Sequence, residues 1–151
     1  MSYITGMDVT AVDTAPKFKL GQIGRTSNGK VYKYVQYDTG SGPVAAVAGN
    51  VAYYYTAGGY KNHKVTSDLS DSVNLGAGVL QSAPGDGEYC WVQIRGPATV
   101  TTALSAGADG NALTAVGATD GTLDVSAAVT DAIVAFADDH SEKEIICMFP
   151  E

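Results

Sequence analysis

An Asn28-Gly29 pair between two runs of β-prone residues is the feature that most constrains this fold. Residues 18–23 precede the pair and residues 31–37 follow it. Asn-Gly is the strongest short-range signal for a hairpin, because both central turn positions favour positive φ. Neither face of the second run is purely polar, since Val31, Lys33, Val35 and Tyr37 alternate with Tyr32, Tyr34 and Gln36. We therefore expect a strand that is covered on both sides, or one whose second face meets another subunit.

Short β-prone runs separated by turn residues continue to the end of the chain. Residues 125–137 fit either a helical stripe or a buried strand, and we favour a strand from about Ala132. The resulting eight to ten short strands predict an all-β fold, a small β-sandwich or barrel-like domain. The other expected strands lie within residues 44–57, 60–66, 78–81, 88–95, 98–104 and 144–149, with turns at 58–59, 84–87 and 96–97.

Length and composition fit one such domain. The chain has 151 residues, of which 45% are hydrophobic and 17% charged, so it can bury a core and is not disordered. Its 18 glycines follow no three-residue period, which excludes collagen. Residues 1–16 are polar and unpatterned, and they predict a flexible N-terminal arm in front of a single β domain over residues 17–151. We expect removal of this arm to leave the fold intact.

The net charge of −7 argues against nucleic acid as a partner, because phosphate binding needs a basic surface. The charge is uneven: residues 1–75 carry 7 basic and 5 acidic side chains, and residues 76–151 carry 2 and 11. This division fits a basic contact surface opposite an acidic face, or simply a β fold that interleaves distant segments. No signal peptide or membrane-length apolar run is evident, so we expect no membrane partner and synthesis in a cytoplasm.

Few residues suggest chemistry. Cys90 and Cys147 lie in alternating apolar runs and are expected to be buried free thiols. Neither His63 nor His140 belongs to a metal-binding spacing, and the acidic segment 138–142 is interpreted as a solvated loop. Nucleophile elbows and phosphate loops are absent from the sequence. We therefore expect no catalytic residues, no cofactor, no metal and no enzymatic activity.

The tyrosines carry the remaining information. Seven of the nine lie between Tyr32 and Tyr60. Tyrosine is enriched both in cores and at protein interfaces, and it also stacks on sugars, so all three interpretations stay open. Trp91 and Arg95, on one face of a predicted strand, are the one pair suited to a sugar. The candidate interface residues are Tyr32, Tyr34, Tyr53, Tyr54, Tyr55, Tyr89, Trp91 and Arg95.

Two segments resemble small virion proteins of tailed bacteriophages. The first, FKLGQIGRTSNGKVYKYVQY, has the pattern Phe-x-Leu-Gly, a glycine turn and Tyr-x-Tyr-Val. The second, GEYCWVQIRGPATV, has a glycine, an aromatic residue and Trp-Val before a further glycine. The resemblance covers residues 16–37 and 77–104.

This resemblance implies a capsid decoration, or cement, protein. Such proteins are β-rich, often homotrimeric, and stabilise the outer surface of the capsid by clamping copies of the major capsid protein. We therefore expect a non-enzymatic structural protein of a virion, made in the host cytoplasm, which sits on the capsid exterior as a homotrimer. Its expected partners are the major capsid protein and further copies of itself. The alternative is a β-module of a phage tail or fibre that binds a host glycan.

Overall fold

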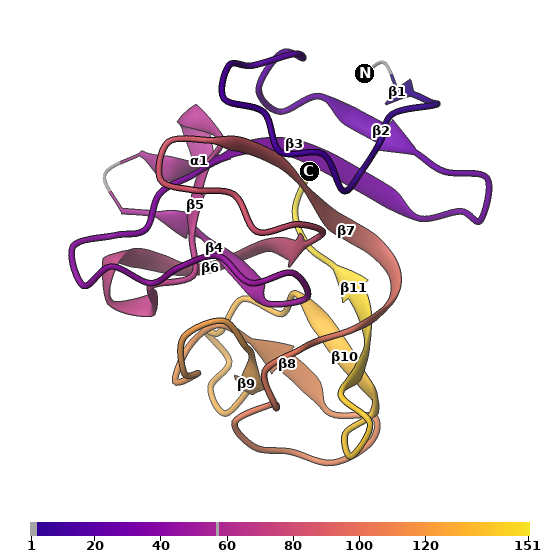
Figure 1. Cartoon of the computed structure of the whole chain (residues 1–151). Helices are drawn as coiled ribbons and strands as arrows, with labels where there is room; N and C mark the ends of the chain where they lie inside the picture. Colours follow the sequence, from indigo (N-terminus) through magenta and orange to yellow (C-terminus); the bar gives the residue numbers. More distant parts are fainter. Residues whose placement is uncertain (1–2, 57) are drawn as a thin grey trace.

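The computed structural model describes residues 3–56 and 58–151, and it is nearly all β (Figure 1). Five strands close into a barrel in the order β3-β5-β4-β6-β7, because β7 pairs with β6 and also with β3. The all-β prediction is thus confirmed, with a barrel as its centre. The barrel strands are β3 (Val31–Tyr37), β4 (Val51–Tyr55), β5 (Lys64–Thr66), β6 (Ser72–Leu80) and β7 (Tyr89–Thr99).

Six further strands extend the barrel sheet in two directions. β1 (Tyr3–Ile4) and β2 (Ile23–Arg25) continue from β3, and they lie at the top of Figure 1. On the other side β7 continues into β11, β10, β8 and β9. These last four strands are β8 (Ala112–Thr114), β9 (Asp124–Val125), β10 (Ala135–Asp139) and β11 (Glu144–Met148). The second extension forms the lower half of Figure 1.

The main core fills the barrel and continues between the barrel and the lower extension. Its members come from strands far apart in sequence, which is what joins the two parts. Fully buried examples are Val35, Ala52, Val65, Val92, Ile94, Leu113, Leu123, Ile145 and Phe149. Cys90 and Cys147 belong to the same core and form no disulfide, as expected. Burial raises the pKa of both thiols to about 12, so neither is a thiolate at neutral pH.

The predicted hairpin forms, but with a different turn. The amide of Gly29 donates to the carbonyl of Thr26, and the amide of Thr26 donates to the carbonyl of Lys30. Only Gly29 has positive φ, at 83°, so the loop is not the two-residue type that needs positive φ at both positions. The first strand is also shorter than expected, because residues 18–20 pack on aromatic side chains instead of entering the sheet.

Three other local predictions are wrong. Residues 60–66 were expected as one strand, but Gly59–Asn62 forms a helical turn, α1, that ends at His63 in the left-handed region, and only β5 follows. Gly96-Pro97 does not end β7, because this part of the strand pairs on one side with β11 and proline's missing N–H is tolerated there. The predicted strand at residues 98–104 is only the end of β7.

The N-terminal segment is not a free arm. β1 pairs in parallel with β2, and Asp13 exchanges two backbone hydrogen bonds with Tyr89 on β7, of 3.0 and 2.9 Å. Ile4, Met7 and Val9 cover the aromatic cluster formed by Tyr32, Tyr34 and Trp91. The prediction of a flexible arm is therefore wrong for residues 3–16, because the barrel itself offers the apolar surface on which the segment packs.

Candidate functional site

An exposed apolar surface lies on the outer side of the lower extension. In the sheet order β7-β11-β10-β8, Pro97 pairs with Ile146, Ile146 with Phe136, and Phe136 with Ala112. Paired residues point to the same side of a sheet, so these four side chains form one row across four strands. Met148, two residues beyond Ile146 on β11, points the same way. We call these five residues the apolar face.

The large side chains of the apolar face are open to solvent. Phe136 is 39% exposed, Ile146 37% and Met148 41%. A solvent-facing antiparallel sheet normally alternates apolar residues inward with polar residues outward. β11 departs from that rule, since Ile145 and Cys147 are buried while Ile146 and Met148 lie outside. Contiguous exposed apolar side chains of this kind mark contact surfaces.

Opposite charges border the two ends of the apolar face. Asp138 and Glu144 line a shallow hollow at one end, together with Lys30 and Thr99. At the other end Arg95 pairs with Met148 across the two strands. The guanidinium of Arg95 donates from Nη1 to the carbonyl oxygens of Phe149 and Ile94, which holds it beside the strand ends. Among the described residues, Arg95, Asp138 and Glu144 form no ion pair.

Most of the predicted interface residues lie inside the molecule. Tyr32, Tyr34, Tyr53, Tyr54 and Trp91 are buried, Tyr55 and Tyr89 are half-buried, and Arg95 alone borders the apolar face. The interface interpretation is therefore wrong for the five buried aromatic residues, and core filling, the other interpretation, is correct for them. The physical reason differs between the strands. Tyr32, Tyr34 and Trp91, on β3 and β7, are covered by residues 3–20, whereas Tyr53 and Tyr54, on β4, belong to the main core.

Tyr53 shows what a buried hydroxyl does here. Its Oη donates to the carbonyls of Thr119 and Thr122 and accepts the amide of Thr122 at 2.9 Å. These contacts fasten the 119–122 turn to β4. Burial raises the pKa of Tyr53, so the phenol stays neutral and keeps its proton for the hydrogen bonds.

We expect Tyr53→Phe to lower the free energy of unfolding by about 1–3 kcal/mol, because it removes the hydroxyl bound to the Thr122 carbonyl and leaves the Thr122 amide only its 3.3 Å bond to Thr119. Tyr55→Phe is the matched control on the same strand: Tyr55 is half-buried, and its hydroxyl takes no part in these contacts. Chemical denaturation of both variants measures the difference. Equal stabilities would contradict a structural role for the Tyr53 hydroxyl.

A lysine lies inside the barrel. Lys33 is 1% exposed, and its Nζ donates to Tyr54 Oη at 2.8 Å. The rings of Tyr54 and Tyr60 lie 5.2 and 5.1 Å from the same nitrogen, and Tyr60 stands on α1. Burial lowers the pKa of Lys33 to about 8, against a smaller opposite effect of Glu151. The hydroxyl of Tyr54 and the two rings explain how a charged residue is tolerated in the core. Lys33 itself is closed to solvent.

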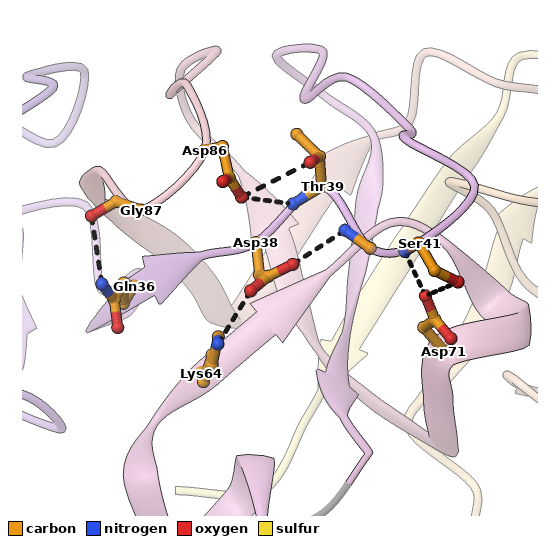
Figure 2. A network of polar contacts seen from close by, with 9 residues as sticks. Gln36, Asp38, Thr39, Ser41, Lys64, Asp71, Asp86 and Gly87 are labelled. Atoms are coloured by element: carbon orange, nitrogen blue, oxygen red, sulfur yellow. Dashed lines mark hydrogen bonds and ion pairs between the residues drawn. The ribbon is translucent and has the colours of Figure 1, made fainter.

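A network of polar contacts lies where β3 ends, around Asp38 (Figure 2). Asp38 receives Lys64 Nζ at 2.7 Å and the amide of Gly40 at 2.8 Å. Partial burial alone would raise the pKa of Asp38, but the hydrogen bonds from Lys64 and Gly40 outweigh it and lower that pKa. Asp86 binds the amide of Thr39, and Asp71 binds Ser41. The bonds from Lys64, Asp71 and Asp86 join residues 38–41 to three other segments of the chain, so the network holds this loop in place.

Within residues 3–56 and 58–151, no three His, Cys, Asp or Glu side chains come together as they would around a metal ion. Asp139 instead caps its own loop, accepting the Ser141 hydroxyl at 2.7 Å and the Glu142 amide at 3.1 Å. In the same part of the chain, no helix has the length and apolarity needed to cross a membrane.

No protein-family model matches the chain, and no curated protein or solved structure does so either. A function for this chain therefore has to be inferred from its own side chains and from the apolar face.

The apolar face was missed at the sequence level, although a signal for it was present. Residues 144–149 were correctly expected as a strand, and both alternating sets of that strand are apolar. The same two-sided pattern in residues 31–37 predicts either a strand covered on both sides or one that meets another subunit. In the structure β3 contacts its own chain on both sides, whereas β11 has one face open to solvent.

Proposed function

We propose that this chain is a non-enzymatic structural protein of a tailed-bacteriophage virion. It decorates and stabilises the capsid exterior, has the major capsid protein and further copies of itself as partners, and works by protein–protein contact. The observation that carries the proposal is the apolar face, because three large apolar side chains exposed side by side on a sheet serve contact with another protein surface. The phage setting rests on the resemblance of residues 16–37 and 77–104.

The rest of the molecule suits such a role. A barrel closed by five strands is a stiff support, and the loops at one end of β3 are joined by the network around Asp38. The glycan-binding alternative relied on Trp91 beside Arg95. Trp91 is buried beneath residues 3–20 and offers no ring face to a sugar, so no observation favours that alternative.

Binding to capsids tests the proposal. Purified protein mixed with expanded capsids of the phage that encodes it should co-sediment with them in a saturable manner. We expect Ile146→Glu to weaken this binding at least about 10-fold, because a charge in the apolar face must be desolvated when the capsid, or a second copy bound on the capsid, covers that face. Val73→Glu is the matched control: Val73 is similarly exposed, at 48%, but lies on β6, outside the face.

Wild-type protein that stays in the supernatant at every concentration would contradict the decoration role. If the wild type and both variants co-sediment equally, decoration stands and the apolar face is not the contact that supports it.

A further inference from the structure

We infer that the apolar face packs against the same face of a second copy of this chain, about a two-fold axis that runs across the strands. The inference rests on the proposed function only in taking the apolar face as a protein contact, and the partner it adds is a second copy of the chain. The axis follows the row Pro97, Ile146, Phe136 and Ala112, so the strands of the two copies run in opposite directions across the interface.

The order of charges along the strands carries this inference. β11 presents Glu144, then Ile146, then Met148 on its outer side, with Asp138 near Glu144 and Arg95 beside Met148. The face is thus acidic at one end, apolar in the middle and basic at the other end. A two-fold axis along the apolar row places the Arg95 end of each copy over the acidic end of the other, so the interface contains two such pairs of opposite charge. The face is therefore complementary to itself.

Other symmetric arrangements lose this complementarity. A two-fold axis parallel to the strands would bring the two Arg95 ends together at one end of the interface and the two acidic ends together at the other, which is unfavourable because like charges repel. A three-fold ring needs two different complementary patches on each subunit, and a flat face cannot cover itself in such a ring. A trimer, as the resemblance implies, would leave the apolar face open, whereas a two-fold pair covers it.

The dimensions of the face predict a modest affinity. Four strands at about 4.8 Å spacing and three outward rows at about 6.8 Å give a patch roughly 20 Å on each side. Two such sheets pack about 10 Å apart, which leaves room for Phe136, Ile146 and Met148 to interdigitate. Such a patch buries about 400 Å² per copy, which is less than a typical stable interface buries, so the pair should be weak and should dissociate on dilution.

The charges at each end are available for the partner. Arg95 is held by the carbonyls of Phe149 and Ile94, hydrogen bonds that leave its positive charge without a carboxylate. Lys30 lines the hollow that contains Asp138 and Glu144, and two carboxylates outnumber that one ammonium. The acidic end therefore keeps a negative charge for the partner's arginine.

Solution mass tests the inference. Light scattering or sedimentation equilibrium over about 5–500 µM, a range suited to a small interface, should show the mass rising from 15.5 kDa toward twice that value. Ile146→Glu should weaken the association at least about 10-fold with an unchanged melting temperature, and Val73→Glu should associate like the wild type. A mass that stays at one chain, a mass that approaches three chains, or an Ile146→Glu variant that pairs normally would overturn the inference.

A charge exchange tests the order of the ends. Arg95→Glu makes both ends of the face acidic, and Glu144→Arg adds a basic side chain to the acidic end. Each variant alone should therefore pair more weakly than the wild type, because like charges then face each other across the interface. Mixed in equal amounts, the two should form a 1:1 pair, detected as a gain in mass over either variant alone. Absence of that gain from two folded variants would overturn the two-fold arrangement. If Arg95→Glu does not fold, Glu144→Arg alone should still pair about 3- to 10-fold more weakly, and an unchanged affinity would count against the inference.

The mass measurement and the capsid measurement fail independently. A protein that pairs through the apolar face but does not bind capsids keeps the self-association and loses the decoration role. A protein that binds capsids through Ile146 but stays a single chain in solution and on the capsid keeps the decoration role, and it replaces the second copy by the capsid as the occupant of the face.

Discussion

Deletion of residues 1–16 should lower the free energy of unfolding by at least about 3 kcal/mol, and the melting temperature by roughly 10 °C for a chain of this size. The segment covers the cluster of Tyr32, Tyr34 and Trp91 with Ile4, Met7 and Val9. Its removal returns the apolar surface of Trp91, now 1% exposed, to water. Thermal and chemical denaturation of the truncated protein measure the loss.

One residue connects this segment to the cluster most directly. Asp13 Oδ2 accepts the Tyr34 hydroxyl at 2.6 Å, and Asp13 Oδ1 lies 3.3 Å from Lys17 Nζ. Burial, with the hydrogen bond to Asp13, raises the pKa of Tyr34 to about 12, so the phenol remains the donor. We expect Asp13→Ala to account for about 1–3 kcal/mol of the loss. Val12→Ala, at an exposed neighbouring position, is the control and should change little. A truncated protein as stable as the whole chain would contradict the packing role.

Lys33→Met should raise the stability at neutral pH by up to about 3 kcal/mol. The folded state holds the pKa of Lys33 at about 8 instead of 10.5, which means that it disfavours the charged form. At pH 7 the lysine is charged in both the folded and unfolded states, so the whole desolvation cost is present. Methionine has nearly the same shape and no charge, and it fits a site lined by the rings of Tyr54 and Tyr60.

The pH dependence gives this prediction its sign. Between pH 8 and 10.5 the unfolded chain still binds the lysine proton while the folded chain has released it, so stability rises with pH. The wild type should gain about 2 kcal/mol relative to Lys33→Met between about pH 8 and 9.5. The other titrating groups are common to the two proteins. The charge of Lys33 contributes to lowering the pKa of His63, but His63 titrates below this pH window and adds nothing to the difference.

Two controls make the Lys33 result interpretable. Lys61→Met removes an exposed lysine on α1 and should leave both the stability and its pH dependence unchanged. Lys33→Met also leaves Tyr54 Oη without its 2.8 Å partner, so adding Tyr54→Phe should recover part of the lost hydrogen-bond energy. If Lys33→Met is less stable than the wild type at pH 7 even with Tyr54→Phe, the buried amine contributes more through its contacts than it costs through its charge.

The N-terminal segment shows where reading the sequence fails for a physical reason. Residues 1–16 have no period, and a segment without a period predicts no strand or helix. Its order comes from Asp13 and Met7 meeting Tyr34 and Trp91, which are distant in sequence. A non-periodic segment becomes ordered when a ready-made apolar surface lies within its reach, and that surface exists only after β3 and β7 have paired.

Local patterns alone determined the all-β class, the hairpin at Asn28-Gly29, the strand at residues 144–148 and the burial of Cys90 and Cys147. Alternation and turn chemistry act between near neighbours, so they can be read before any fold is known. Which side of a two-sided apolar strand stays open depends on what packs against it. Residues 3–20 cover the second face of β3, while nothing in the described chain covers Ile146 and Met148 on β11, and only the tertiary structure could decide between them.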